Sequence, residues 1–434
     1  MFENSFDSYE SSYSFWDGWW KCLGVICPVC DVSSKINKGK RSANRFKVSF
    51  YSLSIDQFLD RNIIDDGLYQ ILIGGNAIDV LIKRGITFSD KALLTFNGAL
   101  SEKARELDLI PNFTGVALAE EIGASVVAFF DPVIYLKDDI YIGWYLGWRE
   151  LNTQKTIILI VNHLAKVMGV SFCSFGGSGG GFASLYYLSE SDEINKAFVW
   201  NCQTVVEKYN SRFWRHLSEV SLQKKLTSEV EFSEEMGAIG ICTSLLSKSD
   251  SLKNKDFIYL QNALDWHTTV HAEPFIKKLD LDDEDGFFYS KEKMLFFKGN
   301  WGAGHAVPPR KLIVSALKLY LADNVAGLRR EVSKYKYIAG ENKIVKKEED
   351  PGFYVSKKPK GLLIEVVDDF SIWATIYEKW DGVVVKKYQY NKEKKFFINC
   401  ESGFEGLSVV LFSKYIDGSV AWREISNQDI MDSF

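Results

Sequence analysis

A glycine-rich turn at residues 175–183, with the sequence FGGSGGGFA, constrains the fold more than any other stretch of this chain. An apolar run at residues 170–175 leads into the turn, and a segment compatible with a helix follows it. A serine at the centre of Gly-x-Ser-x-Gly fits a strained turn between a strand and a helix, which lifts its hydroxyl clear of the sheet. The flanking glycines avoid collisions where the strand and helix pass closely. We therefore interpret Ser178 as a candidate nucleophile.

Glycine-rich turns between a strand and a helix also bind phosphates or serve as plain linkers. A Walker-type phosphate loop requires Lys followed by Ser or Thr after its last glycine, but Phe182 and Ala183 stand there. A dinucleotide fingerprint that starts at Gly177 would also need a small residue where Phe182 stands. On this motif alone, an incidental glycine-rich loop is an equal alternative. The interpretation of Ser178 as a nucleophile therefore depends on catalytic partners further along the chain.

Length, charge and cysteine content narrow the class of protein. The chain has 434 residues, 46% of them hydrophobic, and 52 basic against 57 acidic side chains give a net charge of −5. No global charge attracts nucleic acid, so we expect no nucleic-acid partner. Seven cysteines are an odd number in a long chain, which argues against a disulfide framework and favours a reducing, cytoplasmic location. No apolar run approaches the ~20 residues of a membrane-spanning helix, and the acidic amino terminus does not resemble a secretory signal.

Four segments are expected. Residues 1–44 form an amino-terminal extension, residues 45–330 an α/β domain, residues 331–351 a charged linker, and residues 352–434 a β-rich domain. In the second segment strand-like runs alternate with helical patterns, which indicates a mostly parallel sheet flanked by helices. The last segment has short alternating runs that predict a small antiparallel β-sandwich. Residues 205–255 are expected to be a largely helical insertion. Its two alternative interpretations are a lid over the site and an ordinary crossover between strands.

The amino-terminal extension carries aromatic residues, then Cys22, Cys27 and Cys30, and then a basic stretch. A closed zinc site needs four ligands, and the first histidine comes only at His163, so we expect no metal here. An aromatic segment followed by basic residues can also rest on an acidic membrane surface. We favour the alternative in which its tryptophans pack on the body of the protein.

A serine nucleophile needs a base and an orienting acid. His305 lies in a glycine-rich loop, residues 299–309, directly after a predicted strand at 294–297, and we predict that it is the base. Asp265 follows the predicted strand at 257–261 and is the predicted acid. Loops after parallel strands meet at one edge of the sheet, where ligands bind. The order Ser178, Asp265, His305 is also the chain order of nucleophile, acid and base in one known arrangement of this triad.

Together, the Gly-x-Ser-x-Gly at 176–180, the late Asp265 and His305 resemble the α/β-hydrolase superfamily over residues 45–330. The resemblance implies an oxyanion hole made by the backbone N–H of Gly179 and by a second donor, Gly98 or Ala99. The sequence FNGA at 96–99 departs from the His-Gly-Gly loop of lipases, which leaves the second donor open. A weaker resemblance, to hydrolase-like proteins of bacterial surface-glycan and accessory-secretion loci, rests on residues 96–101 and 179–183.

His267 and His271 form a His-x3-His pair, which can ligate a metal when it lies on a helix. The zincin motif requires Glu directly after the first histidine, and Thr268 stands there, so we expect no metal. We place both histidines at the rim of the substrate pocket. His267 is the reserve candidate for the base, and Glu273 and Asp256 are reserve candidates for the acid.

These residues predict a serine hydrolase that cleaves an ester through an acyl-enzyme at Ser178, without a cofactor. A small-molecule ester and an acylated glycan are the expected substrates. Two alternatives stay open: an acyltransferase that passes the acyl group to a glycan, and a non-catalytic hydrolase-like scaffold or glycan-binding module. The sequence does not indicate the acyl group or the oligomeric state.

Overall fold

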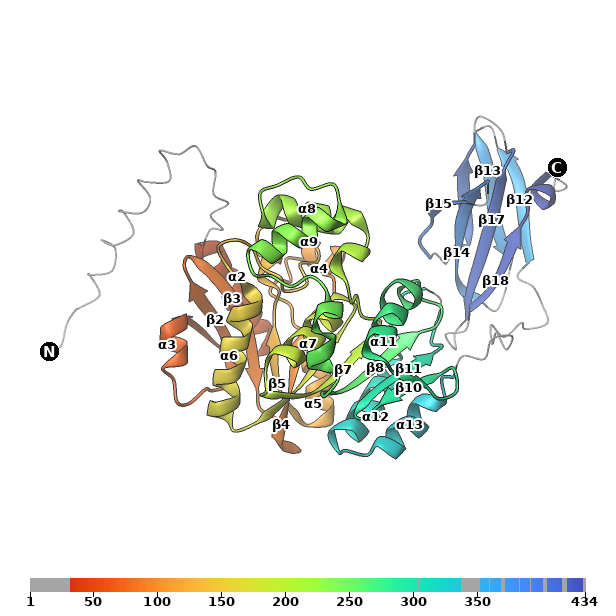
Figure 1. Cartoon of the computed structure of the whole chain (residues 1–434). Helices are drawn as coiled ribbons and strands as arrows, with labels where there is room; N and C mark the ends of the chain where they lie inside the picture. The colour runs from red at the N-terminus through yellow and green to blue at the C-terminus, as the bar shows by residue number, and fades with distance from the viewer. Residues whose placement is uncertain are drawn as a thin grey trace. The chain divides into compact units, whose positions relative to one another are not determined.

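The computed structural model describes residues 32–302 and 304–336, and, in the carboxyl-terminal part, 352–358, 360–367, 371–381, 383–390, 392–400, 404–415 and 420–431. The described residues divide into two compact units, with the division after Tyr335 (Figure 1). The three cysteines near the amino terminus and most of the predicted linker lie outside the described residues. Each unit is described by itself.

An eleven-stranded sheet forms the centre of the first unit, in the order β1-β2-β3-β5-β4-β6-β7-β8-β11-β10-β9. Six neighbouring strands, from β5 to β11 in that order, run parallel to one another. They are β5 (Ala124–Phe129), β4 (Phe88–Phe96), β6 (Ser171–Gly177), β7 (Ile194–Trp200), β8 (Asp256–Asn262) and β11 (Met294–Gly299). The predicted mostly parallel sheet is therefore confirmed, and the carboxyl ends of these six strands share one edge.

Five further strands extend the sheet at both sides. On one side lie β3 (Asn76–Lys83), antiparallel to both of its neighbours, then β2 (Gly67–Ile73) and β1 (Ser49–Ser54). On the other side β10 (Phe288–Lys291) pairs antiparallel with β11, and the short β9 (Asp282–Asp283) follows. The sequence did not predict β10. The helix α2 (Val32–Phe46) precedes β1, so the predicted boundary between the amino-terminal extension and the α/β domain falls inside a helix.

Helices flank this sheet (Figure 1). The helix that leads directly into the central strand β6 is α6 (Thr153–Met168). The side chain of Asn152 accepts a hydrogen bond from the N–H of Lys155 at its start, and Gly169 ends it in a left-handed conformation. The other helices of the unit, outside the insertion described next, are α3 (Ile55–Leu59), α4 (Glu102–Glu106), α5 (Val116–Ile122), α7 (Gly179–Glu190), α11 (Glu273–Leu279), α12 (Arg310–Leu321) and α13 (Val325–Ser333).

The insertion between β7 and β8 is helical, as expected. It contains α8 (Ser211–Ser221), α9 (Glu229–Ala238) and the short α10 (Ser249–Leu252). The buried Trp214 of α8 packs against Phe232 of α9, with ring centroids 5.3 Å apart, which joins the two helices. A lid function for this insertion stays a prediction. Among the described residues, no helix is both long and apolar enough to span a membrane.

The second unit contains two antiparallel sheets. One has the order β12-β13-β16 and the other β15-β14-β17-β18. Apolar side chains from both sheets, including Ile364 of β13 and Leu411 of β17, form one buried cluster, so the sheets face each other as the predicted sandwich. The strands are β12 (Gly352–Lys358), β13 (Gly361–Val367), β14 (Ser371–Trp380), β15 (Val383–Lys387), β16 (Lys395–Asn399), β17 (Leu407–Tyr415) and β18 (Val420–Ile425), and α14 (Asn427–Met431) follows them.

Candidate active site

Ser178 stands at the turn between β6 and α7, with φ 55° and ψ −122°. A non-glycine residue rarely adopts positive φ, so the surrounding structure must impose this conformation. The neighbouring glycines show how tight the turn is. A Cβ on Gly177 would lie 2.2 Å from the ring of Trp200, and one on Gly181 would lie 2.3 Å from Sγ of Cys202. The elbow predicted from the sequence is therefore present, and its glycines are sterically required.

The loop after β4 lies beside this elbow. A Cβ on Gly98 would be 3.7 Å from the Cβ of Ser178, so the predicted oxyanion loop and the serine are neighbours. The N–H of Asn97 donates to the hydroxyl of Tyr145 (2.7 Å). That amide is therefore engaged, which leaves Gly98 and Ala99 as the candidates from this loop. Gly179 is the first residue of α7, where amides have no partner inside the helix.

The Asp265 carboxylate is buried and holds two histidines, one on each oxygen. Nδ1 of His305 lies 2.5 Å from Oδ2, and Nδ1 of His267 lies 2.7 Å from Oδ1. The backbone N–H of His267 also donates to Oδ1 (3.1 Å). An imidazole that donates from Nδ1 has Nε2 as its hydrogen-bond acceptor. The structure therefore brings the predicted acid, the predicted base and the reserve base together.

Burial and hydrogen bonding shift the pKa values of this cluster in opposite directions. Burial alone would raise the pKa of Asp265, but the hydrogen bonds from His267 and His305 outweigh it and hold the pKa well below its usual range. Burial lowers the pKa of His267, and the Asp265 carboxylate offsets only part of that effect. Asp265 is therefore charged at neutral pH, whereas the environment of His267 favours the neutral imidazole.

The two histidines of the His-x3-His pair are buried, which differs from the predicted position at the pocket rim. His267 is 1% and His271 0% exposed, whereas the His305 side chain is 37% exposed. Burial lowers the pKa of His271 to about 3, so this ring is neutral. Among the described residues neither of its nitrogens has a hydrogen-bond partner. His305 is thus the most solvent-exposed histidine of this cluster.

Gln203, which sequence reasoning missed, contacts the candidate nucleophile. Its side-chain Nε2 donates to Oγ of Ser178 (3.0 Å), and Nε1 of Trp144 donates to its Oε1 (2.5 Å). Nε2 of Gln203 also lies 3.5 Å from Nε2 of His267. Gln203 therefore connects Ser178 with the histidine cluster. Neither Gln203 nor Trp144 belongs to a motif, and 59 residues separate them in the chain.

A strained loop carries Trp144 to this position. Trp144 and Tyr145 have φ values of 52° and 59°, which bulky residues adopt rarely. The buried carboxylate of Asp131 accepts hydrogen bonds from the N–H groups of Gly143 (3.1 Å) and Tyr145 (3.0 Å), and these bonds fix the loop. Strain of this kind persists only where the surrounding structure overdetermines it, often at functional sites.

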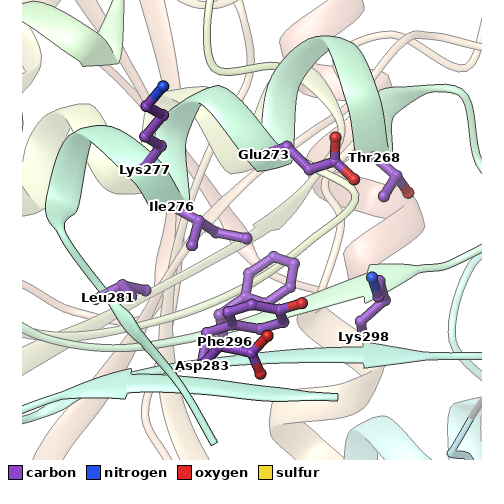
Figure 2. Close-up of a pocket in the computed structure, with 9 residues that line it drawn as sticks. Thr268, Glu273, Ile276, Lys277, Leu281, Asp283, Phe296 and Lys298 are labelled. Atoms are coloured by element: carbon purple, nitrogen blue, oxygen red, sulfur yellow. The ribbon is translucent and has the colours of Figure 1, made fainter. Parts of the chain in front are cut away.

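The reserve acids lie elsewhere. Asp256 stands at the start of β8, where its carboxylate binds Lys196 and the Tyr320 hydroxyl, so it is at the opposite end of the strand from the site. Glu273 lines a separate cavity of about 210 Å³ together with Lys277, Ile276 and Phe296 (Figure 2). Asp265 is therefore the carboxylate that the structure brings to the histidines.

A metal-binding site is the alternative interpretation of such a cluster. Asp265, His267 and His305 each offer a ligand atom, all within 4.8 Å of one another. However, both Nδ1 atoms lie at hydrogen-bonding distance from the carboxylate oxygens, so the atoms that would ligate a metal are already bonded to one another. A hydrogen-bonded acid–base cluster explains these contacts better.

The strained turn with Ser178 follows β6, Asp265 follows β8 and His305 follows β11, so all three residues lie at the carboxyl edge of one parallel sheet. The fold is that of an α/β-hydrolase. No protein-family model matches the chain, and no curated protein sequence matches it.

Solved structures offer distant similarities. The chain is similar to the capsule O-acetyltransferase of Neisseria meningitidis serogroup A, at 15% identity over 61% of this chain and 97% of that one, with a TM-score of 0.42. It is also similar to a monoacylglycerol lipase of Paleococcus ferrophilus, at 12% identity over 57% and 99% of the two chains, with a TM-score of 0.36. At these scores the similarities carry no assignment of reaction or substrate.

Proposed function

We propose that the protein is a serine hydrolase that cleaves a carboxylic ester, with Ser178 as nucleophile, His305 as base and Asp265 as the orienting acid. The observation that carries this proposal is the hydrogen bond from Nδ1 of His305 to the buried Asp265 carboxylate, at the edge of the sheet where the elbow presents Ser178. A carboxylate in this position fixes the tautomer of the imidazole and stabilises its charged form.

In the proposed reaction, Nε2 of His305 takes the proton of the Ser178 hydroxyl while Oγ forms a bond to the carbonyl carbon of the ester. The carbonyl oxygen becomes an oxyanion that the N–H of Gly179 and that of Gly98 or Ala99 would stabilise. The C–O bond of the ester then breaks, and the leaving alcohol takes the proton from His305. Water repeats the sequence on the acyl-enzyme and releases the acid.

We prefer His305 to His267 as the base because the base must carry a positive charge during turnover. His267 is buried, its pKa is lowered, and its Nε2 faces the side-chain amide of Gln203. His305 is more exposed and can exchange protons with the alcohol and with water. Both share Asp265, so the proposal needs a test that separates them.

A fluorophosphonate probe tests the proposal directly, because it reacts with an activated serine. We expect labelling of the wild-type protein and none of Ser178→Ala, with matching far-ultraviolet circular dichroism spectra as the folding control. Hydrolysis of p-nitrophenyl esters of increasing acyl length, with and without sugar acceptors, identifies the acyl group and distinguishes water from a glycan as acceptor. Absence of both labelling and turnover in well-folded wild-type protein would indicate a scaffold and refute the proposal.

A further inference from the structure

We infer that Gln203 is a further catalytic residue, whose side-chain amide donates a hydrogen bond to Oγ of Ser178 while that oxygen carries negative charge. The inference rests on the proposed function, since it assigns a role in the same reaction. Gln203 is fully buried, and its Nε2 lies 3.0 Å from Oγ, the atom that forms and breaks the acyl bond.

The orientation of the Gln203 amide follows from its partner on the other side. The indole N–H of Trp144 can only donate, so the atom that it contacts must be the carbonyl oxygen of the amide. The NH2 group of Gln203 must then face Ser178. Trp144 is therefore a positioning residue, and it is itself 1% exposed in the strained loop that Asp131 holds.

The backbone around Gln203 is fixed as well. The N–H of Gln203 donates to the carbonyl oxygen of Ser178 (3.3 Å). Two residues earlier, the side chain of Asn201 accepts from the N–H of Asn262 (2.8 Å) and donates to the carbonyl of Ala306 (2.7 Å). The segment after β7 is thus tied to the loops that carry the acid and the base. The donor to Oγ is therefore preorganised before substrate arrives.

The second N–H of Gln203 points elsewhere. Nε2 of His267 lies 3.5 Å from Nε2 of Gln203, and because Nδ1 of His267 donates to Asp265, its Nε2 is an acceptor. This contact restrains the amide, whose Nε2 also lies 3.0 Å from Oγ. His267 thus acts on Ser178 through Gln203, which gives the second histidine of the cluster a positioning role.

The chemical effect follows from the charge on Oγ. Its proton passes to Nε2 of His305, Oγ bonds to the acyl carbon, and Gln203 keeps both of its amide protons throughout. The hydrogen bond strengthens when Oγ is alkoxide-like and weakens when Oγ is an ester oxygen, because a charged acceptor forms the stronger bond. Gln203 therefore stabilises Oγ both as it attacks and as it leaves during deacylation.

Gln203→Met tests this role, because methionine has a similar length but no amide donor. We measure the rate of fluorophosphonate labelling and the kcat and KM for p-nitrophenyl acetate. We expect a loss of about 10²-fold in labelling rate and in kcat with little change in KM, as for removal of one preorganised donor. Trp144→Phe keeps a ring but loses the indole N–H, and we expect a smaller loss of about tenfold. Gln70→Met, at a fully buried glutamine of β2 remote from the elbow, is the matched control and should retain the wild-type rate.

Gln203→Glu adds a readout that a merely structural role would not change. A carboxylate beside Oγ has no donor, whereas the protonated acid regains one, so the activity of Gln203→Glu relative to wild type should rise as the pH falls. A rate for Gln203→Met equal to or above that of wild type, together with a flat pH ratio for Gln203→Glu, would overturn the inference while leaving the proposed function intact. A wild-type protein without labelling or turnover would instead refute the proposed function, and the inference with it.

Discussion

Nδ1 of His305 lies 2.5 Å from Oδ2 of Asp265, although 40 residues separate them in the chain. Asp265 follows β8 and His305 follows β11, and these two strands are parallel neighbours in the sheet. Parallel neighbours end at the same edge, so their following loops meet there. The hydrogen bond is thus a direct consequence of sheet topology, and it makes Asp265 the natural first target for mutation.

Asp265→Asn should reduce kcat by about 10⁴-fold, because an amide cannot accept hydrogen bonds from both histidines and favours the wrong tautomer of the base. The substitution keeps the shape of the side chain, so the fold should persist. Steady-state turnover of a p-nitrophenyl ester measures the loss, and circular dichroism checks the fold. A variant with normal fold and near-normal kcat would show that Asp265 has no part in the reaction.

Single substitutions of the two histidines separate their roles. We expect His305→Ala to lose about 10⁴-fold in kcat, because no base remains to accept the serine proton. His267→Gln should lose much less, about 10- to 100-fold, since an amide can still contact Gln203 and Asp265. Comparison of kcat for the two variants is the measurement. The reverse order of losses would identify His267 as the base and correct our assignment.

Much of the site could be predicted from the sequence because its parts are encoded locally. The glycines around Ser178 are required by contacts of about 2 Å that any larger residue would make, and such a steric need is visible as a motif. Asp265 and His305 each directly follow an apolar strand, and the alternation of strands with helical patterns indicates a shared edge. The positions of these residues in the sheet follow from these local signals.

The remainder depends on tertiary contacts that leave no local signal. Gln203 contacts Ser178 through the backbone path of residues 201–203. Within that segment Asn201 has a positive φ of 44°, which asparagine tolerates but which its residue type alone does not predict. Trp144 adopts a backbone conformation opposed to its intrinsic preference. His267 did leave a signal, since an aspartate two residues before it can accept its backbone N–H. The sequence analysis placed His267 at the pocket rim, because a single amino-acid sequence does not show which side chains are buried.

The tight packing of the elbow gives a stability prediction. Gly181→Ala should lower the free energy of unfolding by about 1–3 kcal/mol, because the new Cβ would lie 2.3 Å from Sγ of Cys202. Cys202→Ala removes that sulfur, so the added cost of Gly181→Ala should shrink in the double variant. Urea denaturation of both single variants and the double variant measures the coupling.

Gly237 in α9 supplies the matched control, because a Cβ there would meet nothing within 4 Å. Gly237→Ala should therefore stabilise the protein by up to about 1 kcal/mol, through helix propensity alone. Strictly additive free energies for Gly181→Ala and Cys202→Ala would show that the sulfur contact is not the cause of the destabilisation.

A buried carboxylate away from the site predicts how stability depends on pH. Burial raises the pKa of Asp79 to about 6, although hydrogen bonds from Tyr135 and Gln70 oppose this. Between about pH 4 and pH 6 the native state holds a proton that the unfolded chain has released, so stability falls as the pH rises through this range. For one such carboxyl group, the free energy of unfolding falls by about 3 kcal/mol over this range.

Asp79→Asn removes this titration but keeps the shape of the side chain, so its free energy of unfolding should fall less than that of wild type over the same pH range. Asp131, whose pKa burial also raises to about 6, continues to titrate in the variant, so part of the fall persists. Tyr135→Phe acts in the opposite direction, because loss of the hydroxyl donor raises the pKa of Asp79 further and extends the fall to higher pH. Urea denaturation at several pH values measures all three proteins. Parallel curves for wild type and Asp79→Asn would mean that Asp79 is ionised in the folded protein throughout this range.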